Sequence, residues 1–203
     1  MAGLILKDIL NLKKQAKVYL ILVIFYFAIG VVNENSSMFS SMMTMVAVMI
    51  PITAMSYDER SKWDRYALTM PISRASIVVS RYLLGVIFLI IAYVLSILVN
   101  MVFSRLYTTE NILINIASLS AGITIMSAIF PILFKFGVEK GRILMMLVLF
   151  VPIAFVAIAS KLGISMPDEE TIKSFIYLSP IIAAVIFLVS IYISLSIYKK
   201  KEF

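Results

Sequence analysis

Three carboxylates that lie close together in the sequence are the side chains with the clearest capacity for chemistry. Asp58, Glu59 and Asp64 could act as an acid or a base at a membrane surface. The sequence has no cysteine and no histidine, which excludes thiolate nucleophiles, Ser-His-Asp triads and most zinc sites. It also lacks a glycine-rich P-loop ending in Gly-Lys-Ser/Thr. We therefore expect no catalytic residue, no metal and no cofactor in this chain, with an interfacial enzyme as the alternative.

The same carboxylates belong to a polar stretch, residues 57–81, that separates two apolar runs. Ser61 followed by Asp64 resembles a capping box and Pro71 would end the next turns, so we predict a short helix over residues 62–70. Its apolar side chains form one stripe at helical spacing: Trp63, Tyr66, Ala67 and Met70. The stripe fits a docking helix whose aromatic anchors enter a partner, or an aromatic belt at the lipid headgroups.

The elements around this stretch are strongly apolar. Of the 203 residues, 62% are hydrophobic and 14% are charged, and the mean hydropathy is +1.04, which is far more apolar than a soluble domain. Six stretches without Asp, Glu, Lys or Arg are long enough, or nearly so, to cross a bilayer: residues 18–32, 38–55, 82–103, 112–134, 143–159 and 175–198. The sequence therefore predicts an all-α integral membrane protein with six transmembrane helices in one domain, residues 1–203.

The basic residues predict how this domain is oriented. With six spans, 15 of the 18 Lys and Arg lie on the side of the two termini, so both termini should be cytoplasmic. The positive charge then reflects orientation and anionic lipid, and we expect no nucleic-acid partner. Residues 1–17 could form an amphipathic interfacial helix, a plain basic anchor or the start of a signal peptide. Its two faces would carry Ile5, Ile9 and Leu12 on one side and Lys7, Asn11 and Lys14 on the other.

The predicted spans contain no ionisable side chain, so we expect no proton or sodium relay. Asn100 and Asn115, near the outer ends of two neighbouring spans, could pair with each other or line an outward vestibule. One face of the second span is rich in flexible thioethers and could pack against other helices or line a substrate pathway: Met38, Met42, Met45 and Met49. Small residues in the fourth span predict close helix packing: Ala117, Ser118, Ala121, Gly122 and Ser127.

The polar stretch also resembles a known family. The segments Tyr57-Asp58-Glu59-Arg60, Trp63-Asp64-Arg65-Tyr66, Leu68-Thr69-Met70-Pro71-Ile72-Ser73-Arg74 and Arg81-Tyr82-Leu83 are similar to the cytoplasmic loop of ABC-2 type permeases. Met70 stands where the family commonly has Leu, and Arg81 stands where it commonly has Lys. The most similar subgroup comprises small permeases of roughly this length, which include exporters of amphipathic and antimicrobial peptides such as phenol-soluble modulins.

This resemblance implies a permease subunit of an ATP-binding-cassette exporter in a bacterial plasma membrane. Two permease subunits, identical or different, would assemble with two separate cytoplasmic ATPases, which would bind ATP and Mg. The predicted 62–70 helix would be the coupling helix, and the substrate would be amphipathic or hydrophobic, with a peptide as first choice. We assign the following loop residues to ATPase coupling: Asp58, Glu59, Arg60, Trp63, Asp64, Arg65, Tyr66, Pro71 and Arg74. A membrane scaffold without transport and a passive channel are the alternatives.

Overall fold

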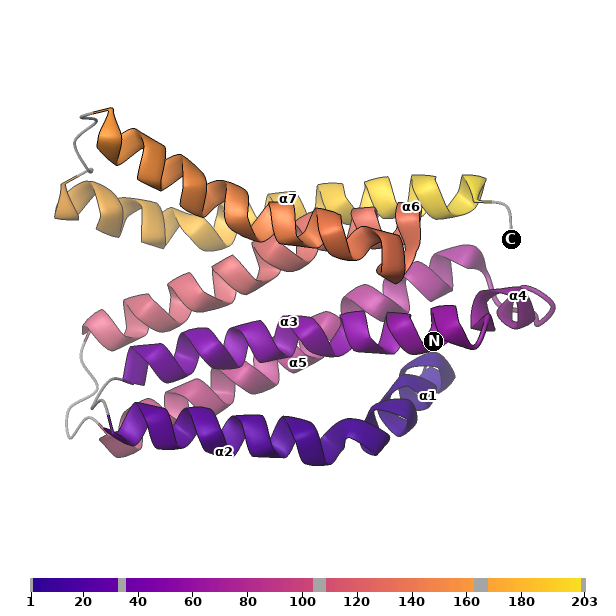
Figure 1. Ribbon diagram of the computed structural model, residues 1–203, viewed down its shortest axis with the longest axis horizontal. Coiled ribbons are helices and arrows are strands. Elements are labelled where there is room, and N and C mark those ends of the chain that lie inside the picture. Colours follow the sequence, from indigo (N-terminus) through magenta and orange to yellow (C-terminus); the bar gives the residue numbers. More distant parts are fainter. Residues whose placement is uncertain (1, 33–35, 104–108, 163–167, 202–203) are drawn as a thin grey trace.

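The computed structural model is a bundle of long helices that run along its longest axis (Figure 1). It describes all residues except 1, 33–35, 104–108, 163–167 and 202–203. Every regular element among the described residues is helical: α1 (Ala2–Leu12), η1 (Lys13–Gln15), α2 (Ala16–Val32), α3 (Ser36–Arg60), α4 (Trp63–Ala67), α5 (Arg74–Phe103), α6 (Thr109–Lys161) and α7 (Glu169–Lys200). The all-α prediction is therefore confirmed for the described residues.

Four segments of these helices are long and apolar enough to cross a membrane: Ser37–Arg60, Arg74–Met101, Ile112–Val148 and Glu170–Lys200. Helix α2 is just as apolar but has only 17 residues. Large apolar side chains along α7, such as Leu188 and Tyr192, are exposed on the surface of the bundle. A surface of this kind needs hydrocarbon as its solvent, so the fold is that of a multi-pass membrane protein.

The two ends of the bundle differ in what they carry. The last residues of α2 and α5 and the first residues of α3 and α7 gather at one end, and α1, α4 and the last residues of α7 lie at the other (Figure 1). We call these the connection end and the terminal end. The polar stretch 57–81 lies at the terminal end, but most of it is helical, because α3 continues to Arg60 and α5 begins at Arg74.

A single glycine turns the chain back at the terminal end. We expected separate spans at 112–134 and 143–159, but helix α6 continues between them and departs from helical geometry at Gly137, where φ is 79° and ψ is 172°. Each arm of α6 thus carries one of the two predicted spans. Gly137 has no Cβ and adopts this backbone conformation without steric cost. Helix α6 consequently has two arms that meet at this glycine (Figure 1).

A buried amide network joins three helices near the connection end. The Asn100 Nδ2 donates to Asn115 Oδ1 at 3.2 Å, and the Ser40 hydroxyl donates to the same oxygen at 2.9 Å. The predicted pairing of the two asparagines is confirmed. All three side chains are buried, so they pack α3, α5 and α6 together and do not line an open vestibule.

Candidate functional site

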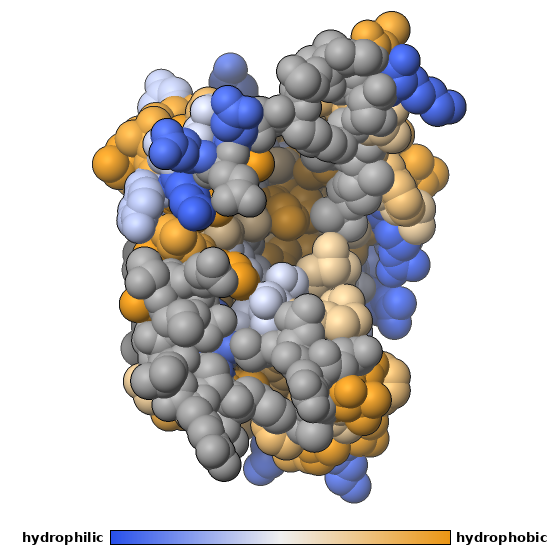
Figure 2. Space-filling model, turned by 90° about the vertical axis from the view of Figure 1, so that its left-hand side faces the viewer, coloured by the Kyte–Doolittle hydropathy of each residue, from blue (hydrophilic) through white to orange (hydrophobic). Residues whose placement is uncertain are grey.

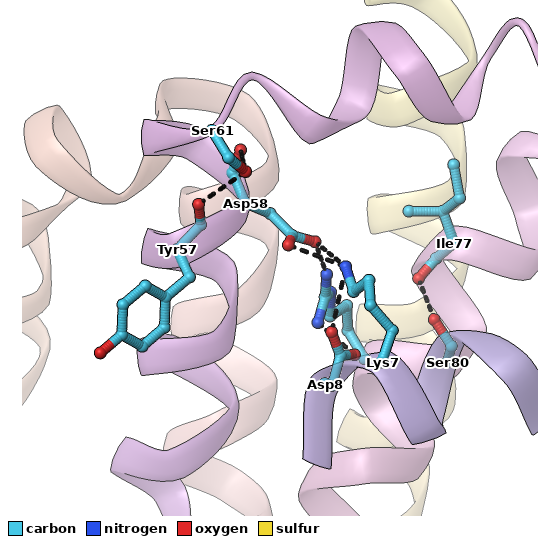
Figure 3. Close-up of polar contacts among 8 residues, drawn as sticks. Lys7, Asp8, Tyr57, Asp58, Ser61, Ile77 and Ser80 are labelled. Carbon is cyan, nitrogen blue, oxygen red and sulfur yellow. Dashed lines mark hydrogen bonds and ion pairs between the residues drawn. The ribbon is translucent and has the colours of Figure 1, made fainter. Parts of the chain in front are cut away.

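Four charged side chains form a closed network at the terminal end, which we call the charge cluster: Lys7, Asp8, Asp58 and Arg81. The Lys7 ammonium donates to both carboxylate oxygens of Asp58 at 2.7 Å and lies 3.1 Å from Asp8 Oδ1. The Arg81 guanidinium bridges the two carboxylates, with Nη1 on Asp8 and Nη2 on Asp58. Figure 3 shows Lys7 and Asp8 of α1 pointing toward Asp58 at the end of α3. The cluster thus ties α1, α3 and α5 together.

Three members of the charge cluster are buried, Lys7 is partly exposed, and the charges of the four balance. Asp8, Asp58 and Arg81 are 1%, 5% and 4% exposed. Burying a charge is costly unless an opposite charge and hydrogen bonds compensate for it, and here two cations face two anions. Burial, reinforced by the nearby Arg81 guanidinium, lowers the pKa of Lys7 to about 8.

Helix α1 is oriented by this cluster. Leu4, Asp8 and Leu12 are buried along one face, while Leu6 and Leu10 are exposed. The predicted helix exists, but Lys7 lies in the charge cluster and not on a solvated outer face. The exposed leucines give α1 an apolar outer surface, and its position at a lipid interface stays a prediction.

Helix α4 is shorter than predicted and begins differently. It comprises Trp63–Ala67 in place of residues 62–70, and it follows Lys62, which has a φ of 52°. The predicted capping box does not form, because no side chain caps the helix and the Ser61 hydroxyl donates backward to the Tyr57 carbonyl at 2.9 Å. The Ser61 hydroxyl is therefore bonded to the last turn of α3 and does not cap α4.

The apolar stripe predicted on this helix has some side chains packed into the protein and others exposed on its surface. Trp63 packs against the main hydrophobic core, and the Lys7 ammonium lies 4.4 Å from the centre of its ring. Ala67 is fully buried, whereas Tyr66 is 63% exposed and Met70 is also exposed. Trp63 is therefore an internal contact between α4 and the charge cluster, and Tyr66 is the aromatic side chain that a partner could reach.

Glu59 contacts the reversal in α6. The Val138 amide donates to its carboxylate, which places a negative charge where the second arm of α6 begins. A Cβ added to Gly137 would lie 2.5 Å from Glu59 Oε1. The carboxylate thus occupies the space that the glycine leaves open, and it joins the end of α3 to the turn of α6.

Two further loop residues contact the end of α7. Arg74 Nη1 donates to the carbonyls of Lys199 at 2.6 Å and Lys201 at 3.1 Å, as a cation at a helix C-terminus should. Asp64 lines a polar cavity of about 170 Å³ beside Lys201. Burial raises the pKa of the Asp64 carboxyl, against the opposing effects of the Tyr198 hydroxyl and the Lys201 ammonium.

The nine loop residues assigned to coupling thus share the terminal end but face two ways. Asp58, Glu59, Trp63, Asp64 and Arg74 contact other helices of the same chain. The others are exposed: Arg60, Arg65, Tyr66 and Pro71. Sequence reasoning missed Asp8 and the pairing role of Lys7 and Arg81. A usable signal was present, because Asp8 is the one acid among residues 1–17.

An apolar groove of about 860 Å³ lies between α3 and the two arms of α6. Met45 and Met49 of α3, which are 47% and 48% exposed, line one wall. Seen from the connection end, the molecular surface is hollowed between the helices and has an apolar floor (Figure 2). Met38 and Met42 belong to the same predicted face but are not among the lining residues. Two of the four methionines therefore line the groove, and a substrate pathway along them stays a prediction.

The opposite walls of the groove come from both arms of α6. The first arm contributes small residues that we had assigned to packing: Ala117, Ser118, Ala121 and Gly122. A Cβ on Gly122 would lie 2.5 Å from Thr44 Cγ2, so close packing and groove formation occur together. The second arm contributes Met145 and Met146. This arrangement offers a flexible apolar surface with thioethers on two sides.

Comparison with known proteins identifies the family. The model of a family described as "ABC-2 family transporter protein" matches residues 3–199. The chain belongs to this ABC-2 family. No curated protein and no solved structure gives a significant match. Membership of the ABC-2 family makes the chain a membrane component of a transporter that works with an ABC ATPase.

Proposed function

We propose that this ABC-2 protein is the permease subunit of an exporter that moves an amphipathic or hydrophobic substrate, a peptide as first choice, out of a bacterial cytoplasm. The chain crosses the plasma membrane six times, with α2, α3, α5, the two arms of α6 and α7 as the passes. Both termini are cytoplasmic, so the terminal end faces the ATPase. ATP and Mg bind to that separate subunit, and a second permease subunit, identical or different, completes the transporter.

The observation that carries this proposal is the position of the groove relative to the charge cluster. Both use α3: the groove follows its length, and Asp58 anchors its end to α1 and α5. A push on α4 from an ATPase would reach α3 through Trp63, Lys7 and Asp58, whose side chains are in contact. Movement of α3 would then change the shape of the groove.

The first test is purification of the tagged full-length chain from its native membrane in mild detergent. We expect mass spectrometry to find a stoichiometric P-loop ATPase, together with ATP hydrolysis in the purified complex. Reproducible absence of that ATPase would contradict the permease proposal and favour a scaffold.

Variants in α4 test the coupling role. Tyr66→Ala should reduce recovery of the ATPase roughly tenfold, as for an exposed aromatic anchor, and leave the thermal stability of the permease unchanged. Tyr177→Ala is the matched control, because this tyrosine of α7 is equally exposed but far from α4. Trp63→Ala and Glu59→Gln should lower ATPase stimulation and export while insertion persists. Normal export in both would contradict a coupling role.

A further inference from the structure

Two arginines lie at the terminal end of the groove, and neither has a partner among the residues that the structure describes. Of the described residues that line the groove, the charged ones are Arg60, at the end of α3, and Arg142, five residues after the turn of α6. Both side chains are exposed. No hydrogen bond or ion pair among the described residues involves either guanidinium. One end of a mainly apolar groove is thus positively charged, with no opposite charge paired to it among the described residues.

The body of the groove is lined mainly by apolar side chains. Three of its hydroxyls are engaged with their own helix: Ser41 donates to Ser37 O at 3.1 Å, Thr44 to Ser40 O at 3.0 Å and Thr53 to Met49 O at 2.9 Å. In an apolar environment, an extended peptide would leave its backbone groups without partners. A hydrocarbon chain or an α-helix, whose backbone groups pair internally, avoids that cost.

The length of the groove distinguishes these two occupants. Ser41 and Arg60 line its two ends on α3, and at 1.5 Å per residue they are about 29 Å apart along the helix. This is comparable to the full hydrocarbon thickness of about 30 Å. The chains of one lipid reach across a single leaflet, whereas a helix of about 20 residues spans the whole distance. Length therefore favours a helix.

We propose that the groove binds one apolar face of a helical peptide and that Arg60 and Arg142 hold its C-terminal carboxylate. The C-terminus of a helix carries the negative end of the helix dipole in addition to the carboxylate. A guanidinium suits a carboxylate because it can donate two parallel hydrogen bonds. This inference rests on the proposed function and adds the polarity of the cargo, whose C-terminal end lies toward the terminal end of the permease.

The test uses the full-length protein in nanodiscs of phosphatidylcholine. The probe is a synthetic helical peptide of about 20 residues, built from Leu, Ala and Ser, with a fluorophore at its N-terminus. One version has a free C-terminal carboxylate and the other a C-terminal amide. We expect the acid to bind wild-type protein roughly tenfold more tightly than the amide. The double variant Arg60→Gln/Arg142→Gln should bind the acid and the amide with about equal affinity. Its affinity for the amide should equal that of the wild-type protein.

Lys140→Gln is the matched control, since Lys140 is an exposed cation on the same arm of α6 and does not line the groove. It should keep the preference for the acid. Equal binding of acid and amide to wild type would overturn the inference, as would loss of the preference in Lys140→Gln. Displacement of the peptide by phosphatidylglycerol in wild type but not in the double variant would assign the arginines to a lipid headgroup instead.

Three further outcomes distinguish this inference from a dimer interface and from the proposed function. If light scattering shows a dimer whose formation excludes the peptide, the groove is an interface between two copies and the inference fails. If the ATPase co-purifies but acid and amide bind equally, the proposed function stands and the polarity of the cargo is wrong. If the acid is preferred but no ATPase is recovered, peptide binding stands without the exporter.

Discussion

Asp58 and Arg60 lie two residues apart on α3, yet their environments are opposite. Two residues correspond to about 200° around a helix, so one side chain faces α1 and α5 while the other faces the groove. Asp58 is buried and contacts two cations, whereas Arg60 is exposed and pairs with no described residue. The same helical turn therefore serves two different purposes.

This contrast distinguishes the charged residues that hold the helices of the permease together from those that other molecules can reach. Paired and buried charges, as in the charge cluster, set the position of α1 and α4 relative to α3. Arg60 and Arg142, which pair with no described residue, lie at the groove with exposed methionines, and this is where we propose that a peptide binds. A sequence motif that looks like one functional unit, Asp58 to Arg60, thus divides into a half that is buried in the bundle and a half that lies at the groove.

The largest effect should follow from removing one member of the charge cluster. Asp58→Asn leaves Lys7 and Arg81 with Asp8 as their one carboxylate partner in the cluster, so a buried charge is uncompensated. Breaking a buried ion pair in this way costs about 3–5 kcal/mol. We expect a much lower yield of folded protein and a lower unfolding temperature, measured by fluorescence-detected size-exclusion chromatography after heating.

Glu139→Gln is the control for Asp58→Asn, because Glu139 is an exposed carboxylate on α6, and its loss should leave the unfolding temperature unchanged. The double variant Lys7→Met/Asp58→Asn restores the charge balance. It should be destabilised by less than the sum of the two single variants, because the residues act in one network. Strict additivity would show that the cluster is not a unit.

The second effect concerns the turn that brings the second arm of α6 to the groove. Gly137→Ala places a Cβ on a backbone that only glycine adopts readily and 2.5 Å from the Glu59 carboxylate, which should cost about 1–3 kcal/mol. The measurement is the same thermal assay. Gly3→Ala is the matched control, because a Cβ on this residue of α1 meets nothing within 4 Å. Equal stability of the two variants would show that the turn tolerates a side chain.

The sequence predicted the helices well because long apolar runs leave few other structures in a membrane. The turn at Gly137 escaped prediction because several charged residues surround this glycine, as in an ordinary loop, and nothing local shows that one residue makes the turn. The pairing of Asn100 with Asn115 was predictable because both lie near the same end of neighbouring spans.

The charge cluster was harder to predict. Lys7 and Asp58 are 51 residues apart, so no local pattern connects them. The orientation of Trp63 depended on this pairing, since Lys7 lies over its ring. Helical spacing placed Trp63 and Tyr66 in one stripe, but spacing alone does not show which side of a five-residue helix meets the protein.

The smallest effect is a pH dependence that arises in the charge cluster. Burial lowers the pKa of Lys7 to about 8, so the protonated share of its ammonium group falls from roughly nine in ten at pH 7 to roughly one in ten at pH 9. The contacts of Lys7 with Asp58 and the Trp63 ring are charged interactions and weaken over that range. We therefore expect ATPase stimulation by the wild-type permease to fall, relative to Lys7→Arg, between about pH 7 and pH 9, because arginine stays protonated.

Stability should change in the opposite direction, which makes the prediction sharp. The unfolded chain binds the Lys7 proton up to about pH 10.5 and the folded chain only up to about pH 8, so the contribution of this group to the free energy of unfolding rises with pH between the two values. The burial cost is present below pH 8 and is relieved above it. Stimulation that falls in step with stability would mean general unfolding, whereas stimulation that falls while stability holds or rises would assign the loss to the contact between Lys7 and Trp63.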